Sequence, residues 1–132
     1  MNNKRVGTNF EREFAGMLSK HGFWAHCIKD NTNGQPFDVI AAKNGKTFVF
    51  DCKDCQGKTF QLSRMEENQR EAMKLWQETG NSEGIFSLRF HGRIYLLGFN
   101  TLERLHSTGR KQISEKDCLH YGKEAERWLS CV

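Results

Sequence analysis

Two carboxylates and a lysine stand on neighbouring predicted strands, an arrangement that can hold a metal ion. Asp38 lies on the first strand, and Asp51 and Lys53 lie on the second. The Asn44-Gly45 dipeptide between them is typical of a two-residue hairpin, because a type I′ turn needs positive φ at both central residues. Counting outward from this turn places Asp38 directly opposite Asp51. Side chains alternate along a strand, so Lys53 shares the face of Asp51.

The opposed carboxylates predict a metal site with an adjacent lysine, built on one hairpin. Like charges directly opposite each other destabilise a sheet, so two carboxylates at this range are tolerated when a divalent cation lies between them. The alternative is an edge hairpin that is merely decorated with charges. The direct pairing of Asp38 with Asp51 argues against it.

The elements that position these residues follow the order helix, three strands, helix, two strands, helix. The first helix opens at Gly7-Thr8-Asn9, and the second is capped by Ser63 and runs to about Glu78. The expected strands cover residues 23–28, 37–42, 47–53, 84–90 and 93–99. This order predicts an α/β fold with a mixed central sheet of about five strands flanked by helices.

Length and charge limit the class of protein. The 132 residues suit one compact domain, so we expect residues 1–132 to form a single domain. A net charge of +4 permits nucleic-acid binding without proving it. No apolar run approaches the roughly 18 residues of a membrane span, and no signal peptide is visible. We therefore expect a cytoplasmic protein with no membrane partner.

The cysteines are expected to be free thiols, because their number is odd and no secretory signal accompanies them. They are Cys27, Cys52, Cys55, Cys118 and Cys131. A structural zinc site built from Cys52, Cys55, Cys118 and His120 is the alternative. The second half lacks the matching C-x-x-C or H-x-x-x-H spacing, which argues against zinc.

The motif residues resemble the core of the PD-(D/E)XK nucleases, in the segments Pro36-Phe37-Asp38 and Asp51-Cys52-Lys53. The helix pattern from Gly7 to Glu13, with Glu11 and Glu13 on either side of Arg12, looks like the archaeal Holliday junction resolvases. Three later segments look like the RecU-type Holliday junction resolvases: Lys58-Thr59-Phe60-Gln61-Leu62, Asn68-Gln69 and Gly84-Ile85-Phe86. The resemblance spans roughly residues 7 to 99 and implies a restriction-endonuclease-like core in a single nuclease domain.

The chain departs from these patterns at two residues and in its length. Asp51 stands where glutamate is usual, and Asn68 stands where the RecU-type pattern has histidine. The long N-terminal arm and the stalk insertion of the bacterial RecU proteins are missing. Compact versions of this kind are typical of phages, so we expect a phage or prophage origin, in a bacterial or phage-infected cell.

The resemblance implies a metal-dependent DNA endonuclease that uses Mg²⁺, with Mn²⁺ as a substitute. These hard cations prefer carboxylate, carbonyl and water oxygens. Asp38, Asp51 and the backbone carbonyl of Cys52 would hold the ion, and Glu11 would bind it through water or hold a second ion. Lys53 would position or help deprotonate the attacking water and offset phosphate charge.

Further residues are predicted to assist the site or to contact DNA. Gln69, which matches the glutamine of the RecU-type pair, would orient DNA or water, and an exposed helical glutamine is the alternative. For Glu11 and Glu13 the alternative is compensation of the helix dipole by acids in the first turn. The predicted DNA-binding residues are Lys4, Arg5, Asn33, Gln35, Lys58 and Thr59. For Lys58 and Thr59, which follow the motif in a loop, the alternative is a solvated turn.

Three functions compete at this point. The first is a Holliday junction resolvase that hydrolyses phosphodiesters in branched DNA during recombination, repair or phage DNA processing. It would act as a homodimer, because cutting two opposed strands needs two sites related by a two-fold axis. The second is a restriction-like or nicking endonuclease on duplex DNA. The third is a DNA-binding protein that keeps the nuclease fold without catalysis.

Overall fold

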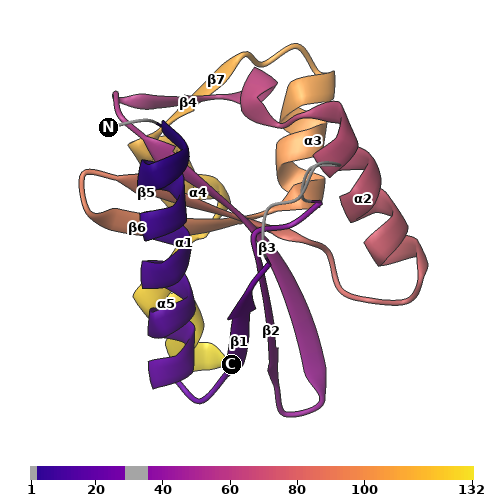
Figure 1. Ribbon diagram of the computed structural model, residues 1–132. Helices are drawn as coiled ribbons and strands as arrows, with labels where there is room; N and C mark the ends of the chain where they lie inside the picture. The colour runs from indigo at the N-terminus through magenta and orange to yellow at the C-terminus, as the bar shows by residue number, and fades with distance from the viewer. Residues whose placement is uncertain (1–2, 29–35) are drawn as a thin grey trace.

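A mixed sheet with helices on both faces forms the centre of the protein (Figure 1). The computed structural model describes residues 3–28 and 36–132, with the backbone alone for residues 3–8. The strands of the main sheet are β1 (Trp24–Cys27), β2 (Val39–Lys43), β3 (Lys46–Cys55), β5 (Ile85–Phe90), β6 (Arg93–Gly98) and β8 (Lys123–Glu124). Strands β3 and β5 run parallel, and the other neighbours run antiparallel. The predicted fold class is confirmed.

The helices divide between the two faces of this sheet. They are α1 (Asn3–Lys20), α2 (Glu67–Glu78), α3 (Phe99–Ser107), α4 (Glu115–Tyr121) and α5 (Ala125–Cys131), and a short 3-10 turn, η1, covers Leu62–Arg64. Apolar residues of α1 and α5 pack in one buried layer, and apolar residues of α2, α3 and α4 pack in another. None of the described helices is long and apolar enough to cross a membrane.

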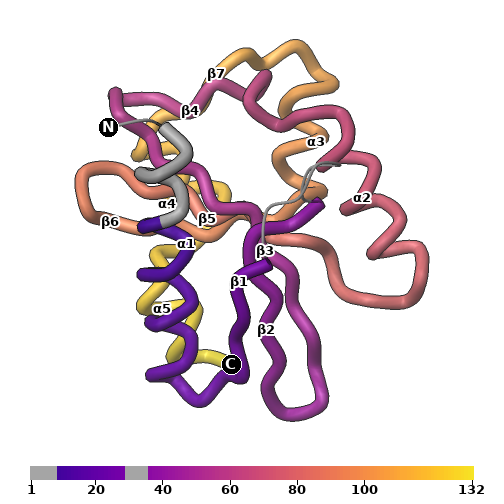
Figure 2. The backbone as a smooth tube through the Cα atoms, in the orientation of Figure 1, coloured from indigo at the N-terminus to yellow at the C-terminus, as the bar shows by residue number. Residues whose placement is uncertain are grey.

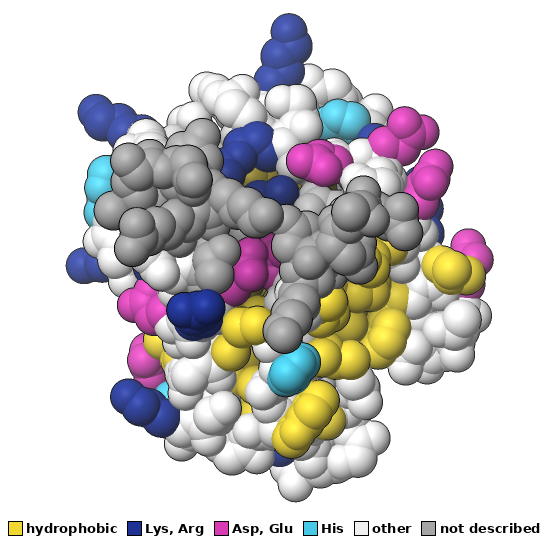
Figure 3. All heavy atoms as spheres, viewed as in Figure 1, with side chains coloured by type: hydrophobic (Ala, Val, Ile, Leu, Met, Phe, Trp, Pro, Cys, Tyr) yellow, Lys and Arg dark blue, Asp and Glu magenta, His cyan; other side chains and the backbone are white. Residues whose placement is uncertain are grey.

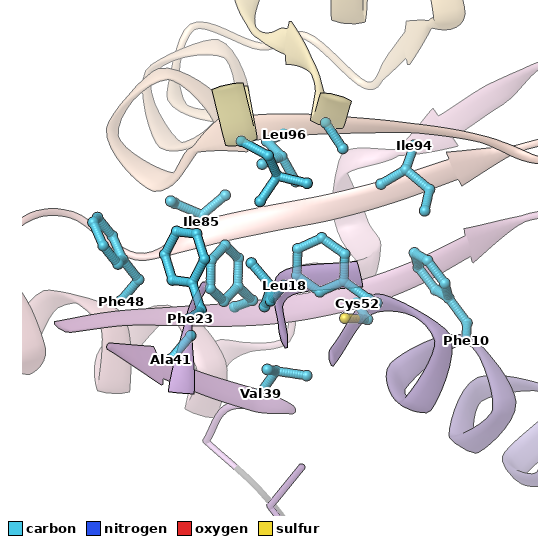
Figure 4. Packing of buried hydrophobic residues seen from close by; sticks show 14 residues of the cluster. Phe10, Leu18, Phe23, Val39, Ala41, Phe48, Cys52, Ile85, Ile94 and Leu96 are labelled. Carbon is cyan, nitrogen blue, oxygen red and sulfur yellow. The ribbon is translucent and has the colours of Figure 1, made fainter. Parts of the chain in front are cut away.

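Strand β3 supplies side chains to both layers, because successive residues of a strand point to opposite faces. Phe48, Phe50 and Cys52 belong to the layer beneath α1 and α5, as the sequence pattern predicts. Figure 4 shows Cys52 in this layer with Phe10 of α1. Cys55 belongs to the opposite layer, so the alternation carries through to the end of the strand.

A second, two-stranded sheet joins segments that are far apart in the sequence. Strand β4 (Thr59–Gln61) pairs antiparallel with β7 (Gln112–Ser114). The two run side by side across the top of the molecule in Figure 2. Phe60 and Ile113 face each other across the pair and are fully buried. Gln61 and Gln112, which alternate with them, are exposed. The ribbon therefore has one apolar face and one polar face.

Two helix starts differ from the sequence prediction. Helix α1 begins at Asn3 instead of Gly7, so Lys4 and Arg5 lie in its first turn. Glycine inside a helix costs only about 1 kcal/mol, which burial of the apolar stripe offsets. Helix α2 begins at Glu67, because residues 62–64 form the 3-10 turn, with Leu62 buried there.

Candidate active site

The hairpin turn fixes the register of the two strands that carry the motif. Asn44 and Gly45 have positive φ values of 52° and 77°, and Lys43 pairs with Lys46, so the predicted turn is confirmed. The regular ladder runs from this turn to Val39, which pairs with Phe50. It stops one residue short of Asp38.

Asp38 therefore lies where the two strands begin to separate. Its backbone N–H still donates to the carbonyl of Phe50, at 2.9 Å. Its carboxylate accepts a hydrogen bond from the backbone N–H of Cys52, at 2.7 Å. The sequence predicts that Asp38 pairs directly with Asp51. In the structure the Asp38 carboxylate is instead hydrogen-bonded to Cys52, one residue further along β3. The two carboxylates remain close enough that Asp38 raises the pKa of Asp51.

Asp51 is a buried carboxylate without a hydrogen-bond partner. The residue has no exposed surface, and neither of its side-chain oxygens has a partner among the described residues. Burial raises its pKa well above the usual range, and the nearby Asp38 adds to this, while Lys53 opposes it. Leaving such a group unsatisfied is costly, so these orphaned oxygens suit a bound cation.

Lys53 connects this carboxylate to helix α2. Its ammonium nitrogen lies 3.5 Å from Oδ1 of Asp51, an ion-pair distance that does not make a hydrogen bond. The same nitrogen donates to the side-chain oxygen of Gln69, at 3.3 Å. Gln69 is only 8% exposed, so the alternative of an exposed helical glutamine is wrong. Sequence alone gave its position on the helix but not this contact.

Cys52 can offer the site its backbone but not its thiol. The side chain is packed in the layer beneath α1, and burial raises the pKa of the thiol well above its usual range. Cys55 and Cys118 are buried in the opposite layer. The two cysteines of the C-x-x-C segment thus belong to different faces of the sheet. This arrangement excludes them as paired ligands of a structural zinc ion.

Glu11 lies on the α1 side of the sheet, near the same strands. Its charge raises the pKa of the Cys27 and Cys52 thiols, after the larger effect of burial. Because α1 begins at Asn3, Glu11 and Glu13 both lie beyond the first turn, and the dipole alternative is wrong for both. Glu13 instead forms an ion pair with Arg89 of β5.

Side chains alone would not complete the coordination of a cation at this site, so backbone, water or substrate oxygens would be needed as well. Within residues 3–28 and 36–132, no three His, Cys, Asp or Glu side chains gather closely enough to hold an ion together. The available donors are the carboxylates of Asp38 and Asp51 and the carbonyl of Cys52. Mg²⁺ commonly binds through one or two carboxylates, water and substrate phosphate, so this oxygen-only set fits it.

The predicted DNA-binding residues lie before and after the motif in the sequence, and the structure describes the side chains of two of them. Lys58 is exposed in the turn after β3, whereas Thr59 is half-buried and opens β4, so its placement in a loop is corrected. Asn33 and Gln35 lie outside the described residues, as do the side chains of Lys4 and Arg5. Figure 3 shows acidic and basic side chains side by side near the middle of one face.

Comparison with known proteins identifies the family. The model of the archaeal Holliday junction resolvase (Hjc) family matches residues 2–126. The chain belongs to this family. This match confirms the predicted resemblance to the archaeal Holliday junction resolvases, and with it the PD-(D/E)XK nuclease superfamily.

Two relatives of the Hjc family are similar to this chain. The crossover junction endodeoxyribonuclease Hjc of Methanocaldococcus jannaschii is 24% identical over 93 residues. The match spans 70% of this chain and 65% of that relative. The solved structure of Archaeoglobus fulgidus Hjc, a Holliday junction resolvase, has a TM-score of 0.70 at 22% identity. It covers 93% of this chain and 99% of the other. That likeness shows the shared fold.

Proposed function

We propose that this chain is a metal-dependent DNA endonuclease that cuts four-way junctions. The observation that carries the proposal is the buried carboxylate of Asp51, which lies beside Asp38 and is ion-paired with Lys53 but accepts no hydrogen bond from the described residues, in a chain of the Hjc family. A buried carboxylate that accepts no hydrogen bond destabilises a fold, and a bound cation would offset this cost. A DNA-binding protein without catalysis would have no need of it.

The proposed cofactor is Mg²⁺, with Mn²⁺ able to replace it. Asp38 and Asp51 would hold the ion together with the Cys52 carbonyl, and Glu11 would reach it through water. When bound, such an ion lowers the pKa of a coordinated water and offsets charge on the phosphate. The hydrogen bond from the Cys52 N–H fixes the Asp38 carboxylate in place before any ion arrives. This preorganisation supports a role in binding.

Lys53 is proposed to orient the attacking water and to offset phosphate charge. Its side chain is 13% exposed, so the ammonium group is largely shielded but still reachable from solvent. Gln69 holds it from the α2 side, at 3.3 Å. A neutral amide restrains the lysine without adding negative charge, and the remaining N–H groups can contact a phosphate oxygen. We propose Gln69 as its positioning residue.

The proposed working unit is a homodimer acting on branched DNA. Two cuts in opposed strands need two sites related by a two-fold axis. Trp24 and Leu75 are large hydrophobic residues, each 62% exposed, and such side chains are common at protein interfaces. Hydrophobic side chains also gather on the face seen in Figure 3. The single nuclease domain over residues 1–132, the cytoplasmic location and the phage origin stay predictions.

The test is cleavage of a labelled four-way junction beside a linear duplex of the same sequence. Each substrate is incubated with Mg²⁺, Mn²⁺ or EDTA, using the wild type, Asp38→Asn and Asp51→Asn. Glu71→Gln, an exposed acid on α2, is the matched control for loss of one negative charge. We expect paired, metal-dependent nicks in the junction alone, lost in both aspartate variants and kept in the control.

The other outcomes separate the competing functions. Equal cutting of junction and duplex would replace the resolvase with a restriction-like or nicking endonuclease. Binding of the junction without any cutting, in either metal, would leave the non-catalytic DNA-binding protein. If Asp51→Asn still cuts the junction, the proposed metal site is wrong.

A further inference from the structure

A basic hollow lies beside the β4–β7 ribbon, outside the candidate active site. It has a volume of about 350 Å³. Its lining residues are Gln61, Ser63, His106, Gly109, Arg110 and Lys111. They include a guanidinium, an ammonium, an imidazole, an amide and a hydroxyl group, and no carboxylate. Such a set offers hydrogen-bond donors and positive charge to an anion.

The walls of the hollow are held by the pairing of the ribbon. The N–H of Leu62 donates to the carbonyl of Lys111, at 2.9 Å, which ties η1 to the segment before β7. The side chains of Gln61 and Gln112 are hydrogen-bonded across the ribbon, at 2.7 Å. Because these contacts are made within the fold, the hollow is present without a ligand.

Hydrogen bonds to residues outside the hollow orient the side chain of Arg110. Its Nε donates to the carbonyl of Gln112 at 3.1 Å, and one terminal nitrogen donates to Asp117 at 2.7 Å. The carboxylate of Asp117 offsets part of the guanidinium charge. Lys111 is exposed and, by contrast, forms no ion pair with another described residue. Lys111 is therefore the stronger source of attraction for an anion.

A single residue links the hollow to the candidate active site. Arg64 follows Ser63 in η1, and its side chain donates to the carbonyl of Asp54, at 3.3 Å. Asp54 follows Lys53 on β3. Arg64 thus places a basic side chain near the end of β3, on the element that also lines the hollow. A chain of phosphates laid from Lys53 past Arg64 to Lys111 would meet a cation at each of these residues.

We propose that the hollow binds a backbone phosphate of the DNA arm that lies next to the cleaved bond. The inference rests on the proposed function and adds a second DNA contact to it, one made by the residues that line the hollow. Contacts of this kind position a nucleic acid without reading its sequence. The hollow therefore fixes the register of the arm against Lys53.

The test measures binding of a four-way junction with Ca²⁺ in place of Mg²⁺, over a range of salt concentrations. Lys111→Gln removes one positive charge from the hollow, and Ser63→Asp places a negative charge in it. Lys46→Gln, at the exposed hairpin tip at the opposite end of β3, is the matched control. We expect Lys111→Gln to raise Kd about three- to ten-fold and to reduce the slope of log Kd against log salt by about 0.9. Lys46→Gln should leave both unchanged.

Several results would overturn the inference without touching the proposed function. One is that Lys111→Gln has the same Kd and the same salt slope as the wild type. Another is that Lys46→Gln loses as much affinity for the junction as Lys111→Gln does. A wild type that binds inorganic phosphate in the hollow, while Lys111→Gln leaves junction binding intact, would assign the site to free phosphate. Failure of the wild type to bind or cut junctions would instead overturn the proposed function. Melting curves of each variant identify a folding defect, and Lys111→Gln carries the test if Ser63→Asp unfolds.

Discussion

The ammonium nitrogen of Lys53 lies 3.3 Å from the side-chain oxygen of Gln69, and this contact joins the central strand to helix α2 at the candidate site. The same nitrogen is 3.5 Å from Asp51. An acid on one side and a neutral amide on the other thus restrain the lysine. Its position is set by two separate elements of the fold, and a change on α2 is expected to affect chemistry on β3.

Replacing Gln69 with alanine should slow cleavage without weakening DNA binding. Without the amide oxygen, Lys53 can move away from the attacking water, and a misplacement of about 1 Å can cost roughly 100-fold in rate. We expect a loss of about 10- to 100-fold in the single-turnover rate at saturating junction. Asn68→Ala, at the exposed neighbouring position, is the control and should change the rate less than about two-fold. A Gln69→Ala enzyme with the wild-type rate would remove the positioning role.

Replacing Asp51 with asparagine should stabilise the metal-free protein while it abolishes cleavage. The carboxylate is fully buried without a hydrogen-bond partner, and asparagine keeps its shape but removes the charge. Burying a carboxylate that accepts no hydrogen bond costs folding free energy, so its removal should raise Tm, by roughly 2–8 °C for each kcal/mol gained in a domain of this size. Melting in EDTA measures the change. Asp38→Asn, which weakens a hydrogen bond from Cys52, should show no gain.

A lower Tm for Asp51→Asn in EDTA would contradict this argument. It would mean that the carboxylate is stabilised by the fold itself, and the cation would no longer be needed to explain its burial. Asp51 would then serve both stability and cleavage, instead of lowering stability in the absence of metal.

The contribution of Asp51 to the stability of the metal-free protein should fall as pH rises through its titration. Its pKa is raised in the folded state by burial, so the folded protein keeps a proton that the unfolded chain releases near its usual pKa of about 4. The contribution of Asp51 to stability is therefore fully present below that value and is lost as pH rises through the raised pKa. A divalent ion competes with this proton, so the gain in Tm on adding Mg²⁺ should grow with pH. Melting curves in EDTA and in Mg²⁺ across pH measure both effects, and Asp51→Asn should flatten both.

The hairpin shows how much of the site the sequence can predict. A two-residue turn at Asn44-Gly45 fixes the register by counting, so the neighbourhood of Asp38 and Asp51 follows from local geometry alone. Counting could not show that the ladder ends at Val39, because the separation of the strands depends on the Cys52 N–H and the Asp38 carboxylate. The metal-binding residues could be proposed, but their exact pairing could not.

Contacts between different helices and strands could not be predicted from the sequence. The burial of Gln69 depends on how α2 packs against β3, which no spacing within α2 reveals. The β4–β7 ribbon joins residues near 60 to residues near 113, and its strands of three residues are too short for a periodic signal. The sequence predicts too late a start for α1, because Gly7 and Thr8 resemble a helix cap although the helix continues through them.

Arg89 is predicted to keep α1, and with it Glu11, in place against the sheet. It donates two hydrogen bonds to Asp54 of β3, at 3.1 and 2.8 Å, and pairs with Glu13 of α1. Its guanidinium also lies over the ring of Phe10, 4.4 Å from the ring centre. Phe10 and Glu13 flank Glu11 on the helix. Arg89→Met should therefore destabilise the fold by about 1–3 kcal/mol, because it leaves the partly buried Asp54 unpaired.

The functional part of this prediction needs a control that loses similar stability elsewhere. Arg70→Met breaks a comparable pair with Glu103, which links α2 to α3 away from α1. Both variants should melt at lower temperature, but Arg89→Met alone should need more Mg²⁺ or Mn²⁺ to reach half of its maximal cleavage rate, by about 10-fold if the contact of Glu11 with the ion is displaced. Metal titrations well below each melting temperature make the comparison. If the two variants require the same metal concentration, Arg89 serves stability alone, and the position of Glu11 does not depend on it.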